Sequence, residues 1–160
     1  KGTRKDTAIN IEATGEFVYN MCTYDLREKM NITAAEFDYG VDEFVAAGLE
    51  KAPSVLVKPF RVKESPIQFE CAYVQTLRLP GYGKAGTVDI IIGKVLGVHI
   101  KDEFILDNGK IDIERIKPLA RMGYSDYTCV EKVFELEPSD ASGDENMYLG
   151  LEGVFGSMPK

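Results

Sequence analysis

The sequence has no tryptophan, only one histidine and only three cysteines among its 160 residues. With His99 as the sole histidine, we expect no catalytic triad, no zinc site and no pair of histidine acid–base groups. Cys22, Cys71 and Cys129 lie far apart, so they lack metal-binding spacing, and an odd number leaves at least one unpaired. We therefore expect no metal, and reduced, buried thiols like those of cytosolic proteins.

Long hydrophobic runs and basic clusters are also missing. The chain carries 19 Lys and Arg against 26 Asp and Glu, a net charge of −7, so nucleic acid is not an expected partner. No apolar run reaches the ~18 residues that cross a bilayer, and the sequence shows no secretory leader. These features predict a soluble, cytoplasmic protein that has no membrane partner.

The sequence does contain two long strand-like stretches, at residues 66–79 and 87–101. Apolar residues of the first alternate with other residues, which is the period of a strand with one buried face. The second is almost continuously apolar and β-branched, which predicts a strand buried on both faces and bent or bulged at Gly93 and Gly97. Turn-forming residues at 80–86 join the two stretches, so we predict an antiparallel hairpin.

The connection between these strands also matches a dinucleotide-binding pattern, Gly81-x-Gly83-x-x-Gly86. That pattern has its meaning between a strand and a helix of a parallel βαβ unit. Because a second strand follows here, we interpret the glycines as hairpin-loop residues.

Long bent hairpins with internal glycines suit a small closed or half-closed barrel, so the predicted fold is mainly β with short helices. Helices are expected at residues 8–15, 26–30, 41–47 and 112–116, with Asp25 as a cap and Gly15 and Gly48 as stops. Further strands are expected at 16–22, 55–57 and 127–136, with a turn at 107–110. The predicted domain covers residues 1–137, followed by an acidic linker at 138–146 and an apolar tail at 147–160.

The most credible binding site lies at residues 3–7. Arg4 and Lys5 supply positive charge, Thr7 supplies a hydroxyl, and the helix that follows presents free backbone amides at its N-terminus. Together these groups suit a phosphate monoester. The alternative is an ordinary solvated, basic entry to a helix.

Five segments in order along the chain resemble one family. They are residues 4–20, 40–49, 64–71, 92–99 and 117–123, which include RKDT, GEFVYN, ESPIQFEC, IGKV and KPLARMG. The chain is similar to the flavin reductase-like proteins, whose fold is an antiparallel, FMN-binding split β-barrel of Greek-key type, in the branch of flavoredoxin and the reductase partners of two-component monooxygenases. Family members begin with further strands and an Asn-x-x-Pro-x-Ser loop that precede this similarity, so we expect an N-terminally incomplete domain.

The resemblance implies FMN as the cofactor, with its phosphate bound by the segment Arg4, Lys5, Asp6 and Thr7. Asp6 carries the wrong charge for a phosphate ligand, so its expected role is that of a cap or a loop brace.

The same resemblance implies that His99, Arg121 and Tyr124 bind the substrate, NAD(P)H or flavin, and that Tyr127 is an alternative cover for the ring. A structural strand histidine and a plain surface loop at residues 121–127 remain open as the other interpretations.

The function implied by the resemblance is an oxidoreductase that passes electrons from NAD(P)H to flavin. Hydride transfer between stacked rings needs no acid–base residue, so none is expected to be catalytic. The family also implies a homodimer with FMN at the subunit interface, the C-terminal tail as a cross-subunit arm, and a monooxygenase or other electron acceptor. The alternatives are a non-catalytic flavin-binding electron-transfer module and a dimerisation or interaction domain that binds no flavin.

Overall fold

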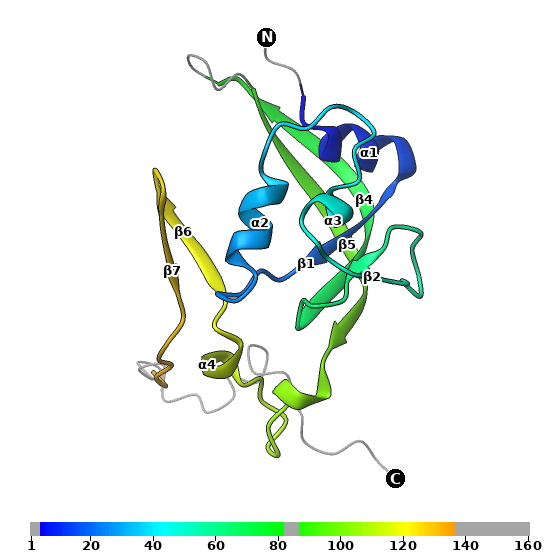
Figure 1. The fold of residues 1–160 in the computed structure, drawn as a ribbon. Helices are drawn as coiled ribbons and strands as arrows, with labels where there is room; N and C mark the ends of the chain where they lie inside the picture. Colours follow the sequence, from blue (N-terminus) through cyan, green and yellow to red (C-terminus); the bar gives the residue numbers. More distant parts are fainter. Residues whose placement is uncertain (1–3, 82–86, 137–160) are drawn as a thin grey trace, which may run out of the picture.

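A three-stranded antiparallel sheet forms the centre of the computed structural model, which describes residues 4–81 and 87–136 (Figure 1). Its strands are β1 (Glu16–Asn20), β4 (Ile67–Leu79) and β5 (Val88–Ile100), in the order β1-β4-β5. β4 and β5 pair along their whole length, so the predicted long hairpin is confirmed. Strands β4 and β5 flank the Gly81-x-Gly83-x-x-Gly86 connection, as predicted, so the pattern does not stand between a strand and a helix. Most of this connection lies outside the described residues.

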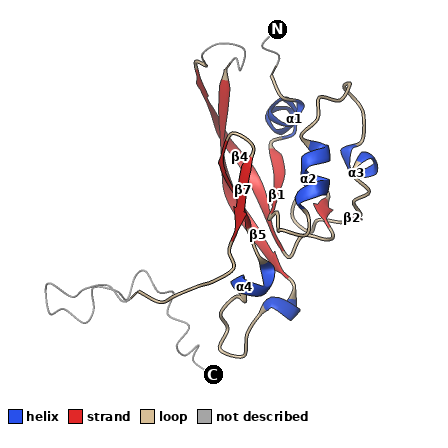
Figure 2. Cartoon of the chain, turned by 60° about the vertical axis from the view of Figure 1, so that its left-hand side comes forward, coloured by secondary structure: helices blue, strands red, loops and turns tan. Residues whose placement is uncertain are grey.

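Short elements surround the hairpin. The helices are α1 (Asp6–Thr14), α2 (Arg27–Thr33), α3 (Glu43–Ala46), the 3-10 helix η2 (Asp102–Phe104) and α4 (Ile113–Ile116). Two small antiparallel pairs complete the strands: β2 (Lys51–Ala52) with β3 (Arg61–Val62), and β6 (Leu119–Gly123) with β7 (Asp126–Cys129). α1, α2 and α3 lie on the same side of the long hairpin (Figure 2). Within residues 4–81 and 87–136, no helix is long and apolar enough to cross a membrane.

The long hairpin is bulged beside the two glycines that the sequence singles out. Glu70 pairs with Gly97 but Cys71 pairs with Val95, and a second shift in register follows Tyr73, the partner of Gly93. Each shift places one extra residue in one strand, which bends the ladder. The predicted bulges are therefore confirmed.

The helix entries and stops agree with the sequence in part. Gly15 ends α1 in the left-handed conformation, at φ +73°, and Gly48 follows α3 at φ +61°, as predicted. Asp42 caps α3 by accepting a hydrogen bond from the Phe44 amide. The predicted cap at Asp25 is wrong, because α2 begins at Arg27 with Leu26 as its uncapped N-cap residue.

The burial predicted for the second strand of the hairpin is wrong. Six of its aliphatic side chains are between 41% and 53% exposed: Val88, Ile90, Ile92, Val95, Leu96 and Val98. The reason is not that β5 is an edge of the sheet, because Val74, Leu77 and Leu79 of the central strand β4 are also 41% to 56% exposed; few described side chains pack over this part of the hairpin.

Three other predicted elements differ from the observed ones. Residues 55–57 form a loop and not a strand, because their amides bond a side chain instead of a neighbouring strand. The predicted strand at 127–136 ends at Cys129, and residues 121–127, expected as a loop, contribute to the β6–β7 hairpin. The predicted linker at 138–146 and tail at 147–160 lie outside the described residues. All three cysteines are free; Cys71 is buried, as predicted for these thiols, whereas Cys22 and Cys129 are partly exposed.

Candidate functional site

The N-terminus of α1 is open to an anion. Lys5, the N-cap residue, is extended and makes no side-chain cap, and the first helical hydrogen bond runs from the Ala8 amide to the Lys5 carbonyl. The amides of Asp6 and Thr7 have no acceptor among the described residues. The side chains of Lys5 and Thr7 are exposed and, within the same part of the chain, unpartnered. Two free amides, an ammonium and a hydroxyl fit a phosphate monoester.

Arg4 is engaged quite differently from Lys5. Its Nη1 and Nη2 donate to the two oxygens of Glu12 at 2.6 and 2.7 Å, and its Nε donates to Asp89 at 2.9 Å. Arg4, and to a lesser extent the Thr76 hydroxyl, lowers the pKa of the Glu12 carboxyl to about 2. Arg4 thus ties α1 to β5, and every nitrogen of its guanidinium already bonds a carboxylate.

His99 lies at the other end of the same strand. It is ten residues beyond Asp89, the partner of Arg4, and that separation along a β-strand is about 30 Å. Within one chain, therefore, the structure does not bring His99 and residues 4–7 together.

His99 contacts a buried carboxylate. Its Nε2 lies 2.5 Å from Oε1 of Glu70, whose side chain is fully buried. Glu70 also accepts hydrogen bonds from the amides of Val55, Leu56 and Val57. Burial raises the pKa of Glu70, but these hydrogen bonds outweigh burial and hold that pKa at about 2.

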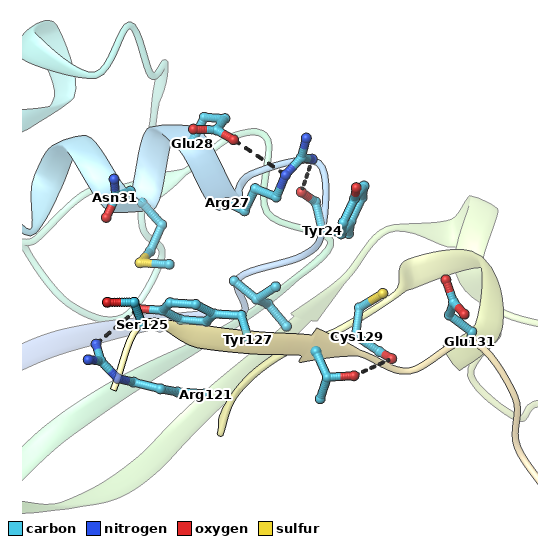
Figure 3. A pocket seen from close by; sticks show the side chains of 12 residues that line it. Tyr24, Arg27, Glu28, Asn31, Arg121, Ser125, Tyr127, Cys129 and Glu131 are labelled. Carbon is cyan, nitrogen blue, oxygen red and sulfur yellow. Dashed lines mark hydrogen bonds and ion pairs between the residues drawn. The ribbon is translucent and has the colours of Figure 1, made fainter. Parts of the chain in front are cut away.

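A groove of about 730 Å³, here called the hairpin groove, lies between α2 and the β6–β7 hairpin (Figure 3). Arg121 and Tyr127 line it from the hairpin, and the Arg121 Nη1 donates to the Tyr127 hydroxyl at 3.0 Å. On the facing side, the guanidinium of Arg27 lies 3.9 Å over the Tyr24 ring. Tyr124 does not line the groove: it occupies the β6–β7 turn with φ +48°, and it is 95% exposed.

A second groove, the helix groove, has a volume of about 650 Å³ and lies between α1, β1 and α2. Thr7 lines it, whereas Arg4, Lys5 and Asp6 do not. Met30 of α2 lines both grooves, so the two are neighbours. Of the predicted site residues, the structure thus places Thr7 and Arg121 in adjacent grooves and leaves His99 and Tyr124 outside both.

Comparison with known proteins assigns the family. Residues 2–114 match the sequence model described as flavin reductase like domain. The chain belongs to the flavin reductase-like family. It is 36% identical over 138 residues to an uncharacterized protein of Deinococcus radiodurans and 36% identical over 121 residues to one of Aquifex aeolicus. These matches cover 84% and 76% of this chain but only 58% and 59% of those relatives, so the chain spans under three fifths of their length.

Solved structures of the family share the fold. Nitrilotriacetate monooxygenase component B from Bacillus cereus superimposes with a TM-score of 0.75 and 30% identity, over 84% of this chain and 66% of that one. A Shewanella frigidimarina protein described as a flavin reductase with a split barrel domain gives 0.71 and 27% identity, over 83% and 65%. Flavoredoxin of Desulfovibrio vulgaris gives 0.68 at 20% identity, over 89% and 74%, which supports the fold alone. The predicted family and split-barrel fold are confirmed.

Two residues of the site, Glu70 and Arg27, are not indicated by the sequence of this family member. Glu70 has the parity of the polar residues in its strand, which predicts a solvent-exposed side chain, and no local pattern shows that residues 55–57 fold over it. Arg27 is followed by Glu28 and Lys29, and three adjacent charged residues on a short helix favour a face turned to water. Its position opposite Arg121 depends on how α2 and the β6–β7 hairpin pack, which adjacent residues do not reveal.

Proposed function

We propose that the protein is an FMN-binding oxidoreductase that passes electrons from NAD(P)H to flavin. The observation that carries the proposal is the open N-terminus of α1, with Lys5 and Thr7, in a chain of the flavin reductase-like family. A bound FMN would supply the hydride-accepting ring, so the chain itself needs no catalytic acid or base. The cysteines of the described region are free, which supports the proposed cytoplasmic location.

The proposed phosphate contacts come from Lys5, Thr7 and the first amides of α1. Asp6 lies in the first turn of α1, where its negative charge interacts favourably with the positive end of the helix dipole. We assign it no direct contact with the phosphate. Arg4 keeps its place in the proposed site as the brace that holds this helix entry on β5, through Glu12 and Asp89.

The proposed substrate contacts come from Arg121, His99 and Tyr124. Arg121 faces the hairpin groove, where a guanidinium beside the Tyr127 ring suits an anionic, planar ligand such as a nucleotide. His99 and Tyr124 retain their proposed roles toward NAD(P)H, although they lie outside the grooves of one chain.

A homodimer is part of the proposal. About 30 Å of β5 separates Arg4 from His99, so one FMN and one nicotinamide cannot be held by both ends of the same strand. In a dimer, the His99 end of one copy's hairpin can lie beside the Arg4 end of the other copy's hairpin. For the electron acceptor we propose free flavin or a monooxygenase component, by similarity to the Bacillus cereus component B.

The experiment that tests this function is an absorption spectrum of the purified chain before and after addition of FMN, followed by NADH or NADPH. We expect flavin bands that remain with the protein through gel filtration and bleach when the nicotinamide is added. Bound flavin that neither nicotinamide bleaches would indicate an electron carrier, and no binding at saturating FMN would contradict the proposal.

A further inference from the structure

The Glu70 carboxylate is the most completely bonded charged group in the described part of the chain. Oε1 accepts from the Val55 amide at 2.8 Å and lies 2.5 Å from the Nε2 of His99. Oε2 accepts from the amides of Leu56 and Val57 at 2.5 and 3.0 Å. The carboxylate is fully buried, so it exchanges all contact with water for three consecutive amides and one imidazole.

These contacts determine which nitrogen of His99 carries hydrogen. An ionised carboxylate is only an acceptor, so the ring must donate from Nε2 whether it is neutral or protonated. When the ring is neutral, Nδ1 is then the acceptor. Nδ1 has no hydrogen-bond partner among the described residues, and the His99 side chain as a whole is 26% exposed, so Nδ1 is left to accept a hydrogen bond from a ligand.

We propose that Glu70 is a positioning residue: it holds His99 in the Nε2–H tautomer and presents Nδ1 to the substrate, while it fixes residues 55–57 over the same strand. The group that Nδ1 recognises is a hydrogen-bond donor of the ligand, such as an amide or a hydroxyl. Resting on the proposed function, we assign that donor to the carboxamide of the nicotinamide.

The lone histidine makes the tautomer directly measurable. In the full chain labelled with ¹⁵N-histidine, every imidazole signal belongs to His99. At alkaline pH we expect a protonated-type signal from Nε2 and an unprotonated-type signal from Nδ1, each assigned through its couplings to the ring carbons' hydrogens. A wild-type chain with its hydrogen on Nδ1 would overturn the inference without any variant or any activity.

Glu70→Gln gives the second arm. The glutamine amide must place its NH₂ group, a donor, where one of the two carboxylate oxygens was. At the position of Oε1 this donor would face one backbone N–H, and at the position of Oε2 it would face two. We therefore expect the NH₂ group to face His99, which forces Nε2 to accept and moves the hydrogen to Nδ1. Glu16→Gln is the matched control, because Glu16 accepts from the next loop amide, that of Lys58, at 2.9 Å but does not touch His99. It should leave the tautomer unchanged.

Steady-state kinetics separates the inference from the proposed function. We expect Glu70→Gln and His99→Ala each to raise the KM for NAD(P)H about tenfold, the effect of about one lost hydrogen bond, with kcat within about twofold. The double variant should be no worse than His99→Ala alone. A Glu70→Gln chain that keeps both the Nε2–H tautomer and the wild-type KM would overturn the inference. A wild-type chain that shows the Nε2–H tautomer yet does not oxidise NAD(P)H would contradict the proposed function only.

Discussion

At the scale of single residues, Arg4 and Lys5 show how two adjacent cations take separate tasks. Arg4 bonds Glu12 and Asp89, whereas Lys5 has no partner among the described residues and sits at the open end of α1. The resemblance assigned both to the phosphate. The geometry supports Lys5 as the contact and Arg4 as the brace, a division that the following substitutions test.

Lys5→Ala should weaken FMN binding about tenfold, the loss of a charge-assisted hydrogen bond, and leave riboflavin binding unchanged because riboflavin has no phosphate. Arg4→Ala, the neighbouring control, should lower the melting temperature, because it leaves Glu12 without its bonded cation and Asp89 with Arg78 alone. Lys5→Ala should not. Titrations of both flavins, with thermal unfolding of each variant, make the comparison. Equal weakening of FMN and riboflavin by Lys5→Ala would contradict the phosphate assignment.

Glu70 predicts how stability depends on pH. Its pKa is lowered from the ordinary value of 4.5 to about 2 in the folded chain. Above about pH 4.5 both states are ionised and the stabilisation is fully present; as the pH falls toward 2 the unfolded state binds the proton first, and roughly 3 kcal/mol is lost. Urea unfolding at several pH values should show this loss in the wild type and a shallower one in Glu70→Gln. Since Glu12 titrates in both chains, equal slopes would contradict the role of Glu70.

At the scale of elements, the sequence predicts what depends on near neighbours. The long hairpin, the bulges beside Gly93 and Gly97 and the end of α1 at Gly15 follow from alternation and from glycine chemistry, and the structure confirms them. Burial did not follow: a continuously apolar strand is equally consistent with a strand whose faces are covered and with a largely uncovered strand such as β5. Likewise the open entry at Lys5 was predictable from local sequence, whereas the Glu70–His99 contact depends on the exact register of the long hairpin, and the bonding of Glu70 depends on the distant loop at residues 55–57.

Gly93 and Gly97 offer a matched pair of substitutions on one strand. A Cβ at Gly93 would lie 2.4 Å from the Phe17 Cζ and 3.2 Å from the Ala72 carbonyl oxygen. Gly93→Ala must therefore displace the Phe17 ring, because the new methyl group is also close to the backbone of the neighbouring strand. We expect it to lower the free energy of unfolding by about 1–3 kcal/mol.

Gly97→Ala is the control for that prediction. Among the described residues, a Cβ there meets only the side chain of Leu56, whose Cδ1 would lie 2.9 Å away, and this side chain is half-exposed and has room to turn away. Its cost in urea unfolding should stay below about 1 kcal/mol. A larger loss from Gly97→Ala than from Gly93→Ala would show that the Phe17 ring does not pack against β5 as observed.

At the scale of the whole molecule, one surface of the long hairpin exposes a cluster of aliphatic side chains. The distal apolar face, defined as Leu77, Leu79, Val88, Ile90 and Ile92, is between 41% and 52% exposed. Cross-strand pairing of Leu77 with Ile90 and of Leu79 with Val88 places these side chains together on one face. The residues between them, among them Asp89, point to the opposite face, where Arg4 ties down α1. A clustered aliphatic face of this kind marks an interaction surface, and the proposed homodimer would cover it.

A charge introduced into the distal apolar face tests the proposed dimer. Ile90→Lys places a charge at the middle of the distal apolar face, where burial against a second copy would leave it unpaired, so the dimer should dissociate to monomers in sedimentation equilibrium. Val45→Lys is the control, because Val45 is 76% exposed on α3, away from this face, and its dimer should persist. If FMN lies between the copies, Ile90→Lys should also weaken FMN binding, whereas Lys5→Ala should weaken FMN binding and remain dimeric. A wild-type chain that stays monomeric at every concentration, or an Ile90→Lys chain that stays dimeric, would show that the hairpin face does not join two copies.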